Sequence, residues 1–409
     1  MRGLTATAAV FLLALGVARA RQDGADDAGA PRWWKGNTHT HTLWSDGDAA
    51  PELAADWYRE HGYHFLVLSD HNVLSHGERW FPVAAGSRLT DERVAALKKR
   101  FGAKRVKLRT TDDGGLEMRL VTLAELRDRF EEPGRFLLVE GEEITISNGV
   151  HINGLNLGEV IPAEEKASVT ATIQHTFDAV REQGERLGRP TLAHLNHPNF
   201  GWAVRPSDVL PVRGVLHFEV YNGHPAVRNG GDSEHASTEE LWDLALTLRL
   251  GDLGREPLYG VSTDDTHHYH RSEPSAANAG RGWVMVRADE LTPAALVEAL
   301  RRGDFYSTTG VELTDVRFDD GVLSVWIDAE DGVSYRTEFL GTRGGAVGVG
   351  EVGEVLASTT SNPARYTLSG DDLYVRARVV SNRRSPSAAE EDGFETAWVQ
   401  PVVNADGPR

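Results

Sequence analysis

The sequence predicts an α/β domain followed by a small all-β sandwich, and two patterns along the chain carry this prediction. From residue 33 to residue 310, apolar runs of strand length alternate with amphipathic helical segments, which is typical of an α/β barrel or a doubly wound sheet. After residue 310 no helical pattern returns, and alternating runs such as "VRFDDGVLSVWID" are split by Gly, Asp and Asn. These runs predict an Ig-like antiparallel sandwich over residues 311–409.

The strands of the first domain are predicted from apolar runs that hardly alternate, as expected of parallel strands covered on both faces. After a first strand near residues 33–38, they lie at residues 64–70, 135–141, 190–195, 215–221 and 257–263.

Helices are predicted between these strands from their end signals. The segment at 51–62 begins with Pro51 and ends with Gly62, the usual entry and exit residues. The segment at 237–251 opens with Ser237 and Glu240 at capping-box spacing, and a further helix covers 292–303. An insertion at about 81–133 holds a helix near 91–101 and a hairpin that turns at Asp113 and Gly114.

The first twenty residues, "MRGLTATAAVFLLALGVARA", have the layout of a secretory signal peptide. Arg2 precedes an apolar run at residues 8–17, and Ala18-Arg19-Ala20 forms a small-x-small cleavage pattern. A membrane anchor is the alternative, but the run is much shorter than the roughly 20 residues that a spanning helix needs. The sequence therefore predicts a secreted or periplasmic protein cleaved near Ala20, with a disordered lead-in at residues 21–32.

Composition limits the partners and the kind of metal site. The formal net charge is -18, so the surface repels nucleic acid and anionic membranes, and we expect neither nucleic-acid binding nor stable membrane insertion. The chain has no cysteine, which excludes disulfides and thiolate metal ligands. Any metal must therefore sit on histidine and carboxylate.

Histidines and carboxylates follow nearly every predicted strand. They are His39, His41, Asp46, His71, Glu140, Glu142, Glu143, His151, His194, His197, Asp264, Asp265, His267 and His268. Because parallel α/β folds gather the carboxyl ends of their strands on one face, we expect these side chains to converge. Such a set suits Zn, Mn or Fe.

A single histidine at a strand end is more often structural than a ligand, but independent structural histidines have no reason to track strand ends. Six histidines and three carboxylates could hold three divalent ions, which would leave a local charge of about +3 in an otherwise acidic chain and so attract an anion. The remaining histidines are assigned to structure or surface: His61, His64, His76, His175, His217, His224 and His235.

The ordered motifs "HTHTLWSDG", "LVLSDHN", "GEEIT" with "HINGL", "NHP" and "DDTH" resemble those of the polymerase and histidinol phosphatase (PHP) superfamily of metal-dependent hydrolases. The leader, "EVYNGH" and "GDFYSTTG" resemble its carbaryl-hydrolase-like branch. The resemblance covers residues 33–310 and implies a distorted (β/α)7 barrel with two or three metals at its mouth. The ligands that it implies are His39, His41, Asp46, His71, Glu143, His151, His197, Asp265 and His267.

Within these motifs several positions offer a choice. Glu143 is chosen over Glu140 and Glu142 as the bridging carboxylate, because it precedes the apolar residue in the Gly-x-Glu pattern. His197 is chosen because it precedes proline, and Asp70, His194, Asp264 and His268 are expected to support the ligands through hydrogen bonds. Glu143, Asp265 and His267 are the expected catalytic residues. Expected substrate contacts are Lys35, Arg205, His270 and Arg271.

The favoured function is hydrolysis of a small anionic phosphoester by a metal-activated water, because clustered cations suit a tetrahedral anion. The chain has no G-x-S-x-G elbow and no Gly-rich nucleotide loop. One alternative is hydrolysis of a carbamate or carboxylic ester on the same metals. Another is a non-catalytic envelope or carbohydrate-binding protein, with a glycan or surface contact through the C-terminal domain. Trp326 and Trp398 could stack on a sugar there, although core packing is the more common role of such residues.

Overall fold

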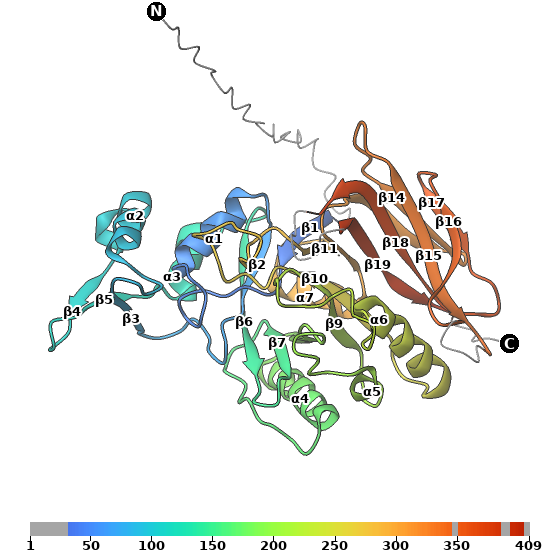
Figure 1. The fold of residues 1–409 in the computed structure, drawn as a ribbon, viewed down its shortest axis with the longest axis horizontal. Helices are drawn as coiled ribbons and strands as arrows, with labels where there is room; N and C mark the ends of the chain where they lie inside the picture. Colours follow the sequence, from blue (N-terminus) through green and yellow to red (C-terminus); the bar gives the residue numbers. More distant parts are fainter. Residues whose placement is uncertain (1–31, 346–350, 386–392, 405–409) are drawn as a thin grey trace, which may run out of the picture. The chain divides into compact units, whose positions relative to one another are not determined.

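Parallel strands form the centre of the N-terminal part, as their apolar sequences predict (Figure 1). The computed structural model describes residues 32–345, 351–385 and 393–404. The strands of this part are β1 (Arg32–Asn37), β2 (Phe65–Leu68), β6 (Leu137–Thr145), β7 (His151–Leu155), β8 (Leu192–Leu195), β9 (Leu216–Asn222), β10 (Leu258–Thr263), β11 (Trp283–Ala288) and β12 (Phe305–Thr308). Each predicted strand is present, with β6 extending four residues beyond its predicted end.

The predicted strands run in parallel, and two strands that were not predicted, β7 and β11, run the other way. β1, β2 and β6 pair in parallel, and so do β8, β9 and β10. β7 lies antiparallel between β6 and β8, and β11 lies antiparallel to β1. The parallel strands therefore point their carboxyl ends the same way, which is the condition for gathering the residues that follow them.

Hydrogen bonding does not close these strands into a barrel. One isolated parallel bridge, between Thr40 and Thr266, joins the segment after β1 to the segment after β10. The His41 N–H also donates to the Thr266 carbonyl at 2.9 Å. The described strands form an open mixed sheet, in which this bridge links the segments that follow β1 and the end strand β10. The expected (β/α)7 closure is not found in their ladders.

The predicted helices form where their end signals lie. They are α1 (Pro51–Glu60), α2 (Asp91–Phe101), α6 (Thr238–Thr247) and α7 (Pro293–Arg302). Ser237 and Glu240 close the expected capping box of α6, and Gly62, just past α1, has the positive φ of +74° that favours glycine. The last turn of the predicted 237–251 helix is a separate π-helical segment, Leu248–Asp252.

Three helices were not predicted: α3 (Leu123–Phe130), α4 (Val169–Leu187) and the short α5 (Pro206–Val209). α4 is capped by Ser168, whose side chain accepts from the Ala171 N–H, and by Gly188 in the left-handed conformation. In the insertion, β4 (Leu108–Thr110) and β5 (Leu116–Arg119) form the predicted hairpin, and β3 (Trp80–Val83) adds to it.

The C-terminal part contains two antiparallel sheets, and one of them continues the large sheet. β13 (Leu313–Asp319), β14 (Val322–Ile327) and β17 (Ala364–Thr367) form a separate sheet. β15 (Tyr335–Arg343), β16 (Glu354–Thr359), β18 (Asp372–Arg384) and β19 (Phe394–Val403) form the other, which joins the N-terminal strands through pairing of β12 with β19. The resulting order is β10-β9-β8-β7-β6-β2-β1-β11-β12-β19-β18-β15-β16.

Apolar packing continues across the predicted boundary at residue 310. One core cluster contains Leu66 and Tyr306 from the first part together with Val325, Phe339 and Val379 from the second. Trp398 is buried and stacks on Tyr221, which is the core role weighed for it. Trp326 is half-buried, with Arg317 and Arg365 near its ring.

The predicted leader at residues 1–20 and the lead-in up to residue 31 lie outside the described residues. β1 begins at Arg32, one residue before the predicted domain start. Among the residues that the structure describes, no helix is long and apolar enough to cross a membrane.

Candidate metal centre

All nine residues expected as metal ligands lie together at the carboxyl ends of the parallel strands. Their nitrogen and oxygen atoms form four groups, each within 4.8 Å. The groups are His41, Asp46, His71 and His267; His39, His197 and Asp265; His39, His41 and Glu143; and His71, Glu143 and His151. We call these nine residues the histidine–carboxylate cluster. Its members are shared between groups, so that neighbouring sites would use common ligands.

The innermost members face one another across very short gaps. His39 Nε2 lies 3.1 Å from His41 Nε2, and Asp265 Oδ1 lies 3.3 Å from the first and 3.2 Å from the second. Both rings are fully buried. Two imidazole lone pairs at this distance repel each other unless a proton or a cation lies between them, so the arrangement suits a cation.

Glu143 lies at the centre of the cluster, on β6. One of its oxygens, Oε1, is 3.0 Å from His151 Nδ1 and 3.3 Å from His197 Nε2, and it also accepts from Asn196 Nδ2 at 2.9 Å. The other oxygen, Oε2, is 2.8 Å from His71 Nδ1. A carboxylate with histidines on both oxygens has the placement of a bridge between two metal ions.

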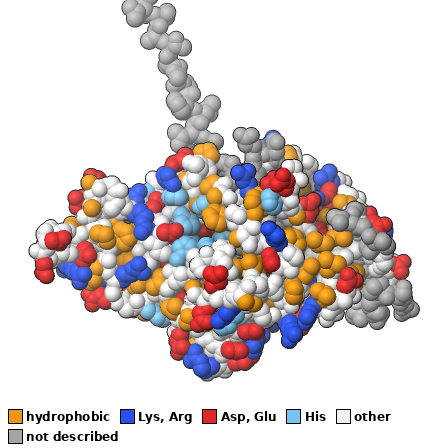
Figure 2. Space-filling view, turned by 60° about the horizontal axis from the view of Figure 1, so that its bottom comes forward, with side chains coloured by type: hydrophobic (Ala, Val, Ile, Leu, Met, Phe, Trp, Pro, Cys, Tyr) orange, Lys and Arg blue, Asp and Glu red, His pale blue; other side chains and the backbone are white. Residues whose placement is uncertain are grey.

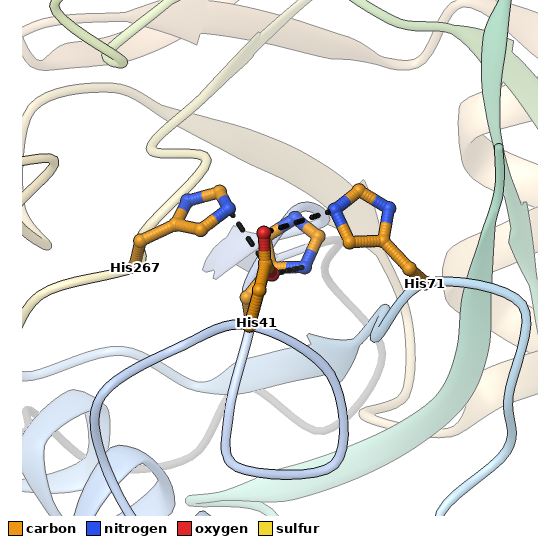
Figure 3. Close-up of side chains that lie close together, drawn as sticks. His41, His71 and His267 are labelled. Carbon is orange, nitrogen blue, oxygen red and sulfur yellow. Dashed lines mark ion pairs between the residues drawn. The ribbon is translucent and has the colours of Figure 1, made fainter. Parts of the chain in front are cut away.

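The cluster is open to solvent on one side. The Asp46 side chain is 52% exposed and that of His71 is 26% exposed, and Asp46 Oδ1 is 3.3 Å from His267 Nε2. Figure 3 shows the rings of His41, His71 and His267 turned toward one another, and each of the three rings forms an ion pair with Asp46. Figure 2 shows histidine side chains gathered on one face of the surface. Small molecules can therefore reach this side of the cluster.

The acids of the cluster keep His71 and His267 protonated, and a bound metal would replace these protons. Burial lowers the pKa of His41 to about 3, and the nearby rings of His267 and His71 add to this. Burial would also lower the pKa of His71, but its hydrogen bonds to Asp46 and Glu143 outweigh burial and raise this pKa to about 10. Burial would likewise lower the pKa of His267, but the hydrogen bond to Asp46 and the charges of Asp265 and Asp46 together outweigh burial and raise this pKa to about 9. Because ligands must be deprotonated, metal binding would release these protons.

The sequence did not single out Glu219, yet this buried residue orients the cluster. Glu219 Oε1 is 2.7 Å from His39 Nδ1, and Oε2 accepts the His197 N–H at 2.7 Å. Thr263 Oγ1 and Asn222 Nδ2 also donate to this carboxylate. By accepting at Nδ1, Glu219 turns Nε2 of His39 toward the other ligands. The available signal was an acid in the middle of the apolar run "VLHFEVY".

Asp70 and His194, expected to support ligands, lie beside the cluster in different ways. Asp70 accepts from Ser45 Oγ at 2.6 Å, and this hydroxyl is 3.3 Å from His41 Nδ1, so Asp70 acts on His41 through Ser45. His194 is fully buried with its ring centre 6.4 Å from that of His39, and no hydrogen bond joins it to a ligand among the described residues.

Asp264 and His268 face away from the cluster. Asp264 accepts from the Tyr58 hydroxyl at 2.7 Å and from the backbone N–H groups of Gly280, Arg281 and Gly282. It therefore anchors the loop after β10. His268 Nδ1 accepts the Ala277 N–H at 3.0 Å. Both residues hold backbone near the cluster instead of bonding to a predicted ligand.

The four residues expected to contact substrate do not join the cluster in the structure. Lys35 is half-buried, with Nζ 4.3 Å from the ring centre of Tyr63 and 4.1 Å from that of Trp283, because its side chain packs against these two rings. The other three are exposed side chains with no contact to the cluster among the described residues: Arg205, His270 and Arg271. In the part of the chain that the structure describes, none of the four touches the nine clustered residues.

Solved structures include one that is similar to this chain, whereas known families and curated proteins give no match. No known protein family matches the chain, and no curated protein matches it. A solved structure from Bacteroides vulgatus ATCC 8482, described as a two-domain protein containing a predicted PHP-like metal-dependent phosphoesterase, is similar in structure. Its sequence identity is 15% and its TM-score 0.40, over 94% of this chain and 100% of that chain.

Proposed function

We propose that this chain is an exported, metal-dependent hydrolase of small phosphoesters. The single observation that carries the proposal is the histidine–carboxylate cluster, in which buried ligand atoms converge and one side stays open. A site closed by protein ligands would indicate a structural metal, whereas an open position is typical of catalysis.

The residues fit divalent metal ions. Imidazole nitrogens and carboxylate oxygens within 4.8 Å of one another suit Zn, Mn or Fe, and the shared use of Glu143 suits two or three ions. Among the described residues, no lysine or arginine forms an ion pair with an acid of the cluster. The acids therefore have no permanent cation of the protein beside them.

When bound, such ions lower the pKa of a coordinated water toward neutrality and stabilise the negative charge of the transition state. The chain supplies the orientation. Asn222 Nδ2 donates to Asp265 Oδ2 at 3.2 Å, which leaves Oδ1 directed at His39 and His41. His267 Nδ1 is 2.9 Å from the Asp265 carbonyl oxygen, which places Nε2 toward the open side, where a substrate would enter.

The surface of this acidic chain repels anions, except where bound cations would concentrate positive charge. A phosphoester is an anion that such a place would attract, so it is favoured over other esters. The closest alternative is a carboxylic ester or carbamate, whose carbonyl carbon the same water would attack. Both readings use the same cluster, so only substrates separate them.

The test is turnover by purified protein that has been stripped with a chelator and reloaded with Zn, Mn or Fe(II). We expect phosphate release from p-nitrophenyl phosphate at a rate well above that with p-nitrophenyl acetate. Elemental analysis should find two or three ions in each chain. If none of the three metals supports phosphate release, the proposal is overturned. If p-nitrophenyl acetate is cleaved faster than p-nitrophenyl phosphate, the substrate class is the carboxylic ester instead.

Export and non-catalytic roles have separate tests. N-terminal sequencing of protein recovered from the periplasm or medium should begin at residue 21 if the leader is cleaved after Ala20. A metal-stabilised envelope protein would lose thermal stability on chelation and show no turnover of either ester. A glycan-binding role of the C-terminal part predicts retention of the full chain on a polysaccharide resin.

A further inference from the structure

His224, which the sequence assigned to structure or surface, stands at the open edge of the cluster. It follows β9 and is half-buried. Its ring centre is 5.3 Å from that of His267, with the planes at 73°. The ring centre of Phe200, a residue that is 40% exposed, lies 6.2 Å from that of His224 and 5.2 Å from that of His197. The two side chains therefore form a wall beside the predicted ligands.

A backbone hydrogen bond determines which ring nitrogen of His224 carries the proton. The Ala226 N–H donates to His224 Nδ1 at 3.1 Å. Since Nδ1 accepts this bond, it holds a lone pair, and the proton of the neutral ring is on Nε2. On an imidazole ring Nε2 points away from Nδ1, so it points away from the backbone of its own loop.

The position of the ring is as constrained as its tautomer. The His224 N–H donates to Asn222 Oδ1 at 2.8 Å, and the Val227 N–H donates to the His224 carbonyl at 3.0 Å. Asn222 in turn donates to Glu219 and to Asp265. The loop is thus tied to the same residues that orient the cluster, and the ring is held ready before a substrate arrives.

His224 is placed as a hydrogen-bond donor and not as a further ligand. None of the four candidate metal groups includes it, and Nδ1 is occupied by the backbone. Among the described residues, no hydrogen bond to Nε2 is found. A half-buried N–H beside an open polar site has substrate or water as its remaining partner.

Resting on the proposed hydrolase function, we propose that His224 Nε2–H donates a hydrogen bond to the leaving-group oxygen of the ester. In a displacement at phosphorus, the entering and leaving oxygens lie roughly in line. Water that attacks from the cluster therefore expels the leaving group toward the rim, where His224 stands. The attacking water oxygen forms the new bond to phosphorus and gives up its proton to bulk water. The old bond breaks with its electron pair moving to the leaving oxygen, which takes a proton from bulk water after release. His224 keeps its proton and stabilises the charge that develops there.

Two substrates and three variants test this role. Phenyl phosphate has a poor leaving group and p-nitrophenyl phosphate a good one, so a donor at the leaving oxygen matters more for the first. We expect His224→Phe to lower kcat for phenyl phosphate by on the order of 10²-fold and for p-nitrophenyl phosphate much less. His224→Gln, which can place an amide N–H near the Nε2 position, should recover part of the loss. His175→Phe, at a half-exposed site on α4, should match wild type with both esters.

Two readouts do not depend on turnover. Metal content per chain should be equal in wild type and in the His224 variants, because His224 is not a ligand. In metal-free protein, the ¹⁵N signals that disappear in His224→Phe should be those of an Nε2–H tautomer.

The inference and the proposed function fail in different ways. Two outcomes with an active wild type would overturn the inference alone. In the first, His224→Phe is as active as wild type on both esters; in the second, it loses the same factor in kcat on both. Loss of metal from this variant, or an Nδ1–H signal, would do the same. A metal-loaded wild type that releases no phosphate would overturn the proposed function, and the inference with it.

Discussion

Two regions of this protein bury several charged side chains, and they stabilise those charges in opposite ways. Between α6 and β18, Asp243 accepts from Arg376 Nε at 2.7 Å and from Nη2 at 2.6 Å, and from the Tyr374 hydroxyl at 2.9 Å. Glu239 pairs with Arg376 and with Arg378. In this ion-pair network every acid has a guanidinium of the protein as its partner.

Within the described residues, the acids of the histidine–carboxylate cluster have no such guanidinium partner. These acids contact histidines, which carry charge only when protonated. In the ion-pair network, burial would raise the pKa of Glu239, but Arg376 and Arg378 lower it instead, and arginine stays charged at any ordinary pH. The difference teaches how to separate structural from functional buried charge. A closed set of permanent ions holds a fold together, whereas acids surrounded by titrating rings have room for an external cation.

The largest expected effect comes from a substitution in the histidine–carboxylate cluster. Replacing Glu143 by Gln removes a carboxylate that contacts His71, His151 and His197. We expect kcat for the phosphoester to fall about 10³-fold, because a bound ion contributes several kcal/mol to transition-state stabilisation. Steady-state kinetics and elemental analysis should show the loss of rate together with loss of metal.

The matched control for Glu143→Gln is Glu142→Gln, the neighbouring position on β6. The Glu142 side chain points to the other face of the strand, where one of its oxygens accepts the Ile161 N–H at 2.5 Å. This variant should keep its metal and its activity. Equal losses in both variants would show that Glu143 has no special part in the cluster.

The next effect breaks the ion-pair network. Arg376→Met leaves Asp243 buried without its cation, so the free energy of unfolding should fall by about 3–5 kcal/mol. Urea denaturation would measure the change, and the folded fraction should keep its metal content. Arg336→Met is the control, because this arginine is exposed and its pair with Glu338 at 3.0 Å should contribute about 1 kcal/mol or less. A loss of metal from the folded Arg376→Met protein would contradict the separation of the two regions.

Glu142 itself sharpens the comparison, since it is a buried acid without an ion-pair partner among the described residues. Burial raises its pKa to about 8, from a value near 4.5 in the unfolded chain. Between these two values the unfolded chain ionises first, so the free energy of unfolding falls as pH rises from 4.5 to 8. Glu142→Gln removes that penalty and should stabilise the protein by roughly 3 kcal/mol at pH 7. The gain should be small near pH 4 and grow toward pH 8. A stability difference that does not change with pH would contradict this reading of Glu142.

The smallest expected effect concerns the residue that turns His39. Glu219→Gln weakens the contact at His39 Nδ1, which is 2.7 Å in the structure. Losing such a support should lower metal affinity by about 10- to 100-fold, measured by competition with a chelator of known affinity. Glu256→Gln, an exposed acid that accepts the Gly214 N–H, should leave the affinity unchanged. An unaltered affinity in Glu219→Gln would mean that the other contacts of His39 are sufficient to orient it.

Sequence patterns predicted the features that depend on neighbouring residues. The helix ends at Pro51 and Ser237 form as expected, because capping involves residues within one turn. The strands form as expected because apolar runs need cover on both faces. The long helix α4 escaped prediction although Ser168 and Gly188 stand at its ends.

By itself, the sequence determined which kinds of side chain follow each strand, and that is why all nine expected ligands could be named before their positions were known. Only the tertiary structure decided which side chains face the same point. It placed Glu219 beside His39, 180 positions away in sequence, packed Lys35 against two aromatic rings, and left the sheet open where a closed barrel was expected. The physical reason is that residue type and local conformation depend on neighbours in the chain, whereas orientation and partnership depend on how distant strands pair and pack.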